Sequence, residues 1–313
     1  MVITNLVVCG GGSKGFAHVG VWCFLQDRQQ TQNIVNVGGT SVGAIVGMVF
    51  SMGATQEYMK DFIVKTDFNQ LKDRGYPGTF IYRILNHFGV FRTDAAERLL
   101  KGAIKDLTGN GDLTFWQLRN MHIKDPSKFK NFECTASNLS NNKIERYSAF
   151  HTPSMKIYEA VLNSMRLPGV FPPGKYMKEQ RPYYIVDGGL AANYPLFLFD
   201  ETRYLEDGQY LKKRKDGTRY NPFTVGVLLE TVPDGEPEYN PINNVYDLFA
   251  ATLDYLQYHA NRSNLRTSDK KRSIYVNCGN VKTTDFGLKK HEKLKLMELG
   301  RAGAEKWFYE DLK

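Results

Sequence analysis

Ser41 has the neighbours that a nucleophilic serine needs. It lies in the sequence Gly39-Thr-Ser-Val-Gly43, which fits the pattern GxSxG. A reactive serine on a sharp turn between a strand and a helix requires small residues on both sides, because larger side chains would collide with the adjoining elements. A helix that begins at Val42 would direct its N-terminus at Ser41 and stabilise the negative charge that develops during acyl transfer. The pattern therefore predicts a nucleophile elbow with Gly39 and Gly43 on its two sides.

A glycine-rich loop precedes this serine in the chain. The sequence Gly10-Gly-Gly-Ser-Lys-Gly15 follows a short apolar run and opens a segment with helical spacing. Because glycine has no Cβ, several backbone N–H groups can point at an incoming oxygen beside a helix N-terminus. The loop is thus suited to form an oxyanion hole. A tight turn between strand and helix, without any chemistry, is the alternative interpretation.

The same loop also fits the dinucleotide-binding pattern GxGxxG at Gly10, Gly12 and Gly15. That interpretation requires an acidic residue about 20 positions later, which would bind the ribose. Residues 29–40 contain no carboxylate. The phosphate-binding pattern GxxxxGK[ST] fails as well, because no lysine follows Gly15. A nicotinamide-dependent enzyme is therefore disfavoured.

Asp187 is the carboxylate best placed to serve Ser41. It ends the apolar run Ile185-Val-Asp and is followed by Gly188 and Gly189, which predict a turn at the end of a strand. Functional sites of open α/β sheets gather at the carboxyl ends of strands, so we expect Asp187 to emerge beside Ser41 and the glycine loop. Burial would raise the pKa of Asp187 and let it accept the Ser41 proton. An Asx-turn or a helix cap is the alternative role.

A histidine base is the usual partner of a catalytic serine, and the chain has 6 histidines. His259 or His291 could in principle complete a triad in the order serine, aspartate, histidine. The α/β-hydrolase fold, however, places its nucleophile well inside the sheet, whereas only one βαβ unit precedes Ser41. We therefore expect a two-residue site in which Asp187 takes the Ser41 proton directly.

The elements that must position these residues are predicted by hydrophobic patterning. A strand over 6–9, a helix over 16–29, a strand over 34–37 and a helix over 42–52 predict an α/β fold with parallel strand pairs. Further strands are expected over 132–136, 143–147, 183–186, 223–229 and 273–278, and further helices over 154–165, 244–265 and 288–309.

The chain of 313 residues is expected to form a single domain. Residues 1–200 would hold the core with all the chemistry-bearing motifs, and 221–313 would complete the same domain. The stretch 207–220, with the basic run Lys212-Lys-Arg-Lys215, is predicted to be a mobile loop.

The charge of the chain favours anionic partners. Lysine plus arginine less aspartate plus glutamate is 41 − 33 = +8, and residues 261–295 alone carry ten basic against three acidic side chains. Anionic membrane surfaces attract such segments, although a solvated helix face is an equally plain interpretation. The N-terminus has no signal-peptide pattern, no apolar run reaches membrane-spanning length, and the 4 cysteines fit no disulfide framework. A cytoplasmic protein with peripheral membrane contact is expected.

Taken together, the three motifs resemble the patatin-like phospholipase family. That family is recognised by a GGGx[RK]G oxyanion loop, a GxSxG elbow and a DG[GA] motif, which here are Gly10–Gly15, Gly39–Gly43 and Asp187–Gly189 in the family's order. Secondary similarities extend over most of the chain, at 89–94, 112–115, 167–173, 193–195 and 283–286.

The resemblance implies a three-layer α/β/α fold with a mostly parallel central sheet. It also implies Ser41 as nucleophile, Asp187 as general base, and an oxyanion hole made mostly by the amides of Gly11 and Gly12, with Lys14 bracing the loop. The implied activity is hydrolysis of acyl esters of membrane glycerolipids without a cofactor or metal. The segment 106–117 departs from a calcium-binding loop at Thr108 and Gln117. Substrate selectivity and any activating partner stay open.

A different class of function is also conceivable for this sequence. A hydrolase fold without activity could bind anionic membrane or nucleic acid through the basic segments. No aromatic-rich RNA motif or recognition helix supports nucleic-acid binding, so we expect none.

Overall fold

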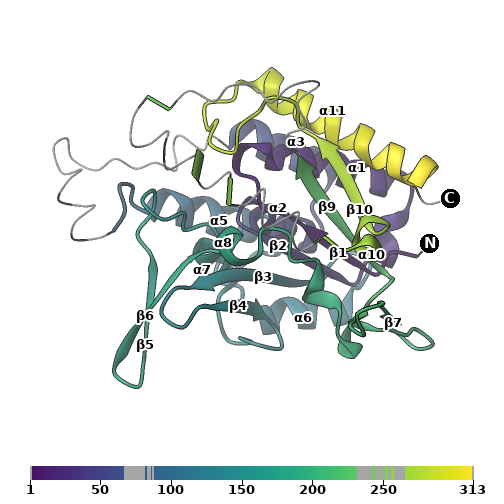
Figure 1. The fold of residues 1–313 in the computed structure, drawn as a ribbon, viewed down its shortest axis with the longest axis horizontal. Helices are drawn as coiled ribbons and strands as arrows, with labels where there is room; N and C mark the ends of the chain where they lie inside the picture. Colours follow the sequence, from purple (N-terminus) through teal and green to yellow (C-terminus); the bar gives the residue numbers. More distant parts are fainter. Residues whose placement is uncertain are drawn as a thin grey trace.

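The computed structural model describes residues 2–66, 88–230 and 265–311, together with isolated residues 82, 86, 242–243, 248, 251–252 and 255–256. The helix expected over 244–265 therefore lies almost entirely outside the described residues. Figure 1 shows a sheet with the long helices packed on it and with the C-terminal helix crossing the same side as the first helix.

An eight-stranded sheet forms the centre of the fold, with the strand order β10-β9-β1-β2-β3-β6-β5 and with β4 paired to β3. The strands from β10 to β3 are parallel, and β4, β5 and β6 are antiparallel additions at one end. Their bounds are β1 Asn5–Val8, β2 Asn36–Thr40, β3 Asn131–Asn138, β4 Lys143–Ser148, β5 Gly174–Lys178, β6 Arg181–Asp187, β9 Thr224–Glu230 and β10 Ser273–Asn277.

Most helices contribute to one large core on one face of this sheet. They are α1 Ala17–Asp27, α2 Val42–Ser51, α3 Gln56–Lys65, α5 Asp94–Thr108, α6 Phe115–Lys124, α7 Ile157–Ser164 and α11 Lys290–Lys306. Leu6 and Val8 of β1 face this core, whereas Val7 between them points to the other face and packs on Leu198 and Phe199. The alternation follows from the period of two in a strand.

The second face has a thinner cover among the described residues. It consists of the short helices α8 Gly189–Ala192, η3 Leu196–Phe199 and η4 Thr202–Tyr204. The expected three-layer α/β/α architecture with a mostly parallel sheet is confirmed, with one helical layer much thicker than the other.

In two segments the structure has features that the sequence patterns did not specify. The glycine loop leads into a 3₁₀ turn, η1 Gly12–Phe16, before α1 begins at Ala17. Residues 207–220 contain a short antiparallel pair, β7 Lys212–Lys213 with β8 Arg219–Tyr220. Arg214, between the two strands, forms ion pairs with Asp200 and Asp269, so the pair is attached to the body of the domain. Residues 207–220 therefore have secondary structure and anchoring contacts, and their mobility stays a prediction.

The register of β3 explains how the domain brings distant segments together. β2 pairs with the first half of β3 and ends with Thr40 opposite Thr135. β6 runs antiparallel and pairs with the second half of β3, ending with Asp187 opposite Ala136. Since β4 pairs with residues 133–138 of β3 along one edge, β2 and β6 both pair with the other edge of β3. Their C-terminal ends therefore meet. Asp187 thus reaches the carboxyl edge of β2 at the end of an antiparallel strand.

None of the helices within the described ranges combines the length and the apolar character that crossing a membrane would require.

Candidate active site

Ser41 and Asp187 are in direct contact where β2 and β6 meet. The Ser41 hydroxyl donates a hydrogen bond of 2.6 Å to Asp187 Oδ2. Ser41 follows β2, begins the turn into α2, and has φ 55° and ψ −125°, a strained conformation for a residue with a side chain. Backbone strain of this kind gathers at functional sites, because it exposes one side chain at the expense of local stability.

The two glycines of the GxSxG pattern allow this turn to pack closely. A Cβ on Gly43 would lie 2.4 Å from the carbonyl oxygen of Cys9 and 2.5 Å from that of Val8, and a Cβ on Gly39 would lie 2.4 Å from the carbonyl oxygen of Gly43. Contacts this short with backbone atoms cannot be relieved by moving a side chain. Both positions therefore require glycine.

Asp187 is buried and has few hydrogen-bond partners. Its exposed fraction is 2%, and its Oδ1 accepts a hydrogen bond of 2.7 Å from the amide of Gly189. Burial raises the pKa of Asp187 to about 6, although the hydrogen bonds from Ser41 and Gly189 work in the opposite direction. A carboxylate with such a pKa is mostly ionised at neutral pH and basic enough to share the serine proton.

Only part of the glycine loop has free amides. The Gly10 amide donates to the carbonyl of Asn193 at 2.9 Å, and the Lys14 amide donates to the carbonyl of Gly11 at 3.1 Å. Within the described part of the chain, the amides of Gly11 and Gly12 have no acceptor. They are therefore backbone donors that could bind an incoming oxygen, whereas the Gly10 and Lys14 amides hold the loop in place.

The loop lies directly against Ser41. A Cβ on Gly10 would lie 3.3 Å from Ser41 Cβ and 2.3 Å from Asn193 Oδ1, so only glycine lets the loop approach both residues. Its far side is fixed by the Ser13 amide, which donates to the Thr283 carbonyl at 3.0 Å. Gly15 lies within η1 and faces the Val42 side chain. The glycine loop and the turn at Ser41 are thus packed against each other.

Ser164 is a residue of this site that the sequence motifs did not single out. It is the last residue of α7 and is fully buried. Its hydroxyl accepts a hydrogen bond of 2.8 Å from the Ser41 amide, and its carbonyl accepts one of 3.1 Å from the Gly188 amide. The next turn continues this pattern, since the Arg166 carbonyl accepts from the Asp187 amide at 2.9 Å. The C-terminus of α7 therefore holds the segments of both Ser41 and Asp187.

The described histidines lie away from this contact. His18 is buried in α1, where its Nε2 pairs with the Cys9 carbonyl at 2.9 Å and burial lowers its pKa to about 4. His122 and His151 pair with Phe129 and Ser148. His291 is exposed, whereas His87 and His259 lie outside the described residues. None of the four described imidazoles hydrogen-bonds to Ser41 or Asp187.

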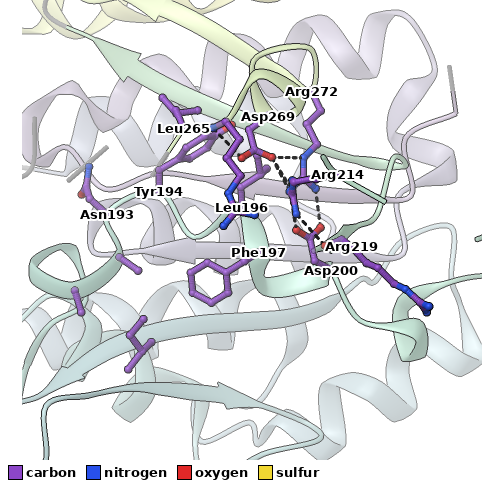
Figure 2. Close-up of a pocket in the computed structure, with 14 residues that line it drawn as sticks. Asn193, Tyr194, Leu196, Phe197, Asp200, Arg214, Arg219, Leu265, Asp269 and Arg272 are labelled. Carbon is purple, nitrogen blue, oxygen red and sulfur yellow. Dashed lines mark hydrogen bonds and ion pairs between the residues drawn. The ribbon is translucent and has the colours of Figure 1, made fainter. Parts of the chain in front are cut away.

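A cavity of about 430 Å³ lies beside the site and is lined in part by charged side chains. Figure 2 shows Arg214 and Arg272 pointing at Asp200 and Asp269 within it. Each arginine contacts both carboxylates at 2.7–3.3 Å. These mutual ion pairs satisfy the buried charges, so the cluster joins the end of η3, the β7–β8 pair and α10 Thr267–Lys270 and has a structural role. Neither Ser41 nor Asp187 lines this cavity.

Groups of three or more histidine, cysteine or acidic side chains that could hold a metal ion do not occur within the described ranges. Asp112, in the segment considered as a calcium loop, forms ion pairs with Lys101 and Lys156.

Relatives of this chain are found among known sequences and solved structures. The chain is 26% identical to the uncharacterized protein YqhO of Bacillus subtilis over 97% of this chain and 98% of that protein. It is 25% identical to the lysophospholipase NTE1 of Candida glabrata over 61% of this chain, but this covers only 9% of that enzyme. Among solved structures, VipD from Legionella pneumophila superposes with a TM-score of 0.63 at 19% identity, over 98% of this chain and 67% of that one.

The family comparison covers the whole region in which the site is built. The family described as patatin-like phospholipase matches residues 6–200, which include the glycine loop, Ser41 and Asp187. The matched region is more than half of the 313 residues. This chain therefore belongs to the patatin-like phospholipase family.

Proposed function

We propose that this protein is a lipid acyl hydrolase that cleaves carboxylic esters of membrane glycerolipids through a Ser41–Asp187 dyad. The family membership supports lipid ester chemistry, as does the name of the lysophospholipase relative. The 2.6 Å hydrogen bond from the Ser41 hydroxyl to Asp187 is the single observation that carries the proposal.

In the first half of the proposed reaction, Asp187 takes the hydroxyl proton of Ser41 as the Ser41 oxygen attacks the acyl carbonyl carbon. The carbonyl oxygen becomes an anion that the free amides of Gly11 and Gly12 bind. The bond to the glycerol oxygen then breaks, and Asp187 returns the proton to that leaving oxygen. A lysolipid is released and the acyl group stays on Ser41.

In the second half, Asp187 takes a proton from a water molecule that attacks the acyl-enzyme carbonyl. The same amides bind the second oxyanion. When it collapses, the Ser41 oxygen leaves and recovers the proton from Asp187, and a free fatty acid is released. One water is consumed for each ester cleaved, and the enzyme returns to its initial state.

Phospholipids are the proposed substrates, and the enzyme would reach them by peripheral contact with anionic membranes. The net charge of +8 supports an attraction to acidic headgroups.

Serine reactivity and fatty-acid release test the proposal together. A fluorophosphonate probe should label the wild-type protein and fail to label Ser41→Ala. Fatty-acid release from mixed phospholipid vesicles should fall to background in the same variant. Absence of Ser41-dependent labelling and hydrolysis would refute the proposed activity and favour a binding module.

A further inference from the structure

The β5–β6 hairpin projects outward from the edge of the sheet at which Ser41 lies. Only residues 185–187 of β6 pair with β3, opposite its last three residues. Because β3 runs toward the carboxyl edge, the outer part of β6 and all of β5 continue beyond that edge. The turn lies about six residues, or roughly 20 Å, from Asp187. Figure 1 shows this hairpin extending from the body at the lower left.

The outer part of the hairpin is unusually apolar for its exposure. Tyr176 and Met177 have exposed fractions of 40% and 60%. Tyr183 stacks on Tyr176 with ring centroids 5.2 Å apart, and Tyr184 makes an edge contact with Phe88, which is 57% exposed. Both faces of the hairpin thus present aromatic rings to the surroundings.

Basic side chains accompany these rings. Lys175, Lys178 and Arg181 lie on the exposed part, against the single carboxylate of Glu179, which gives 3 − 1 = +2. None of the three cations forms an ion pair with a described residue, and Lys175 lies over the Tyr184 ring at 5.9 Å. Their charge is therefore available to a partner.

We propose that the β5–β6 hairpin is the element that docks this protein on an anionic lipid surface. The assignment rests on the proposed function and names where the enzyme meets its substrate-bearing membrane. Tyrosine rings prefer the boundary between lipid and water, and cations beside them bind acidic headgroups. A protein partner of complementary charge would need a broad surface on this chain that matches its own shape. A narrow projecting hairpin with rings and cations on both faces is instead suited to insertion between lipid headgroups.

Flotation with phosphatidylcholine vesicles, with and without phosphatidylserine, tests the assignment with the full-length chain. Three variants are compared with the wild type. The double variant Tyr176→Ser/Met177→Ser removes apolar surface. Met177→Asp does so without disturbing the hydrogen bonds of the Tyr176 hydroxyl with Asn138 and Glu145. The triple variant Lys175→Gln/Lys178→Gln/Arg181→Gln removes the charge.

A matched control removes apolar surface elsewhere. Trp116 and Ile123 of α6 are 52% and 64% exposed, and α6 lies well away from the hairpin in Figure 1. The double variant Trp116→Ser/Ile123→Ser should bind vesicles as the wild type does. Hydrolysis of a water-soluble short-chain ester is measured for every variant, because it needs the dyad and no membrane.

The two apolar variants should bind both vesicle types roughly tenfold more weakly or worse. The charge variant should lose most of the preference for phosphatidylserine, roughly tenfold or more in binding. All three should keep wild-type activity on the soluble ester. Hairpin variants that bind vesicles like the wild type, or a control variant that loses as much binding as they do, would overturn the assignment. If instead the proposed activity is wrong, no Ser41-dependent hydrolysis of the soluble ester should be observed, while vesicle binding through the hairpin should stay intact.

Discussion

Thr40 and Asp187 lie opposite consecutive residues of β3, Thr135 and Ala136, although they belong to strands that run in opposite directions. The chain therefore places the residue after Thr40, which is Ser41, at the tip of β6. This register is the structural reason that a hydroxyl and a carboxylate so distant in sequence share a hydrogen bond of 2.6 Å.

Ser164→Ala should slow catalysis without weakening substrate binding. The change leaves the Ser41 amide, now held at 2.8 Å by the Ser164 hydroxyl, without an acceptor in a partly buried site. This costs about 1–3 kcal/mol and misplaces the proposed nucleophile. We expect kcat to fall roughly tenfold to a hundredfold with KM nearly unchanged, and Ser164→Thr to restore part of the loss. As a matched control, Thr55→Ala removes a hydroxyl that accepts the Tyr58 amide at the start of α3 and should leave kcat unaltered. Equal kcat values for wild type and Ser164→Ala would show that this contact has no positioning role.

The pH dependence of kcat/KM should follow the ionisation of Asp187. Burial raises the pKa of this carboxyl to about 6, and the base is active only when ionised. Activity on a soluble ester should therefore rise with pH through a midpoint near that value and level off above it, falling about tenfold for each pH unit below. A flat profile between pH 4 and 8 would contradict the role of Asp187 as base.

Gly43→Ala should destabilise the protein strongly. The added methyl group would meet the carbonyl oxygens of Val8 and Cys9 at 2.4–2.5 Å, and neither backbone segment can move without displacing β1. We expect a loss of about 3 kcal/mol or more in the free energy of unfolding. Gly102→Ala in α5, where a Cβ meets nothing within 4 Å, should instead stabilise by about 0.5–1 kcal/mol. Similar melting temperatures for the two variants would show that the close packing at Gly43 is not required.

Arg272→Leu should cost stability and not catalysis. Its side chain is 4% exposed and pairs with Asp200 and Asp269, so its removal leaves buried carboxylates with too little positive charge, at a cost of about 3–5 kcal/mol. The exposed pair between Arg301 and Asp27 is the control, since Arg301→Leu should cost less than about 1 kcal/mol. Chemical denaturation measures both, and kcat of the folded fraction should match the wild type. A selective loss of kcat in Arg272→Leu would mean that the cavity of Figure 2 takes part in the reaction.

Much of this site could be predicted from short sequence patterns. The pairing register between strands distant in the sequence could not. The elbow around Ser41 is encoded by its own glycines, strand and helix, so its geometry could be predicted from five residues. Two hydrogen bonds of the site link segments more than a hundred residues apart, and no short motif specifies them. They run from the Gly10 amide to the Asn193 carbonyl and from the Ser41 amide to the Ser164 hydroxyl. For the same reason the antiparallel direction of β6 could not be predicted, because it depends on the strand with which β6 pairs.

The most direct test of the account is the initial rate of fatty-acid release from phosphatidylcholine vesicles by Asp187→Asn, measured beside Ser41→Ala and the double variant. Because two residues that act as a unit lose nearly all activity when either is removed, the three variants should be equally slow, about a thousandfold or more below the wild type. Turnover by Asp187→Asn close to that of the wild type would contradict the direct transfer of the Ser41 proton to Asp187.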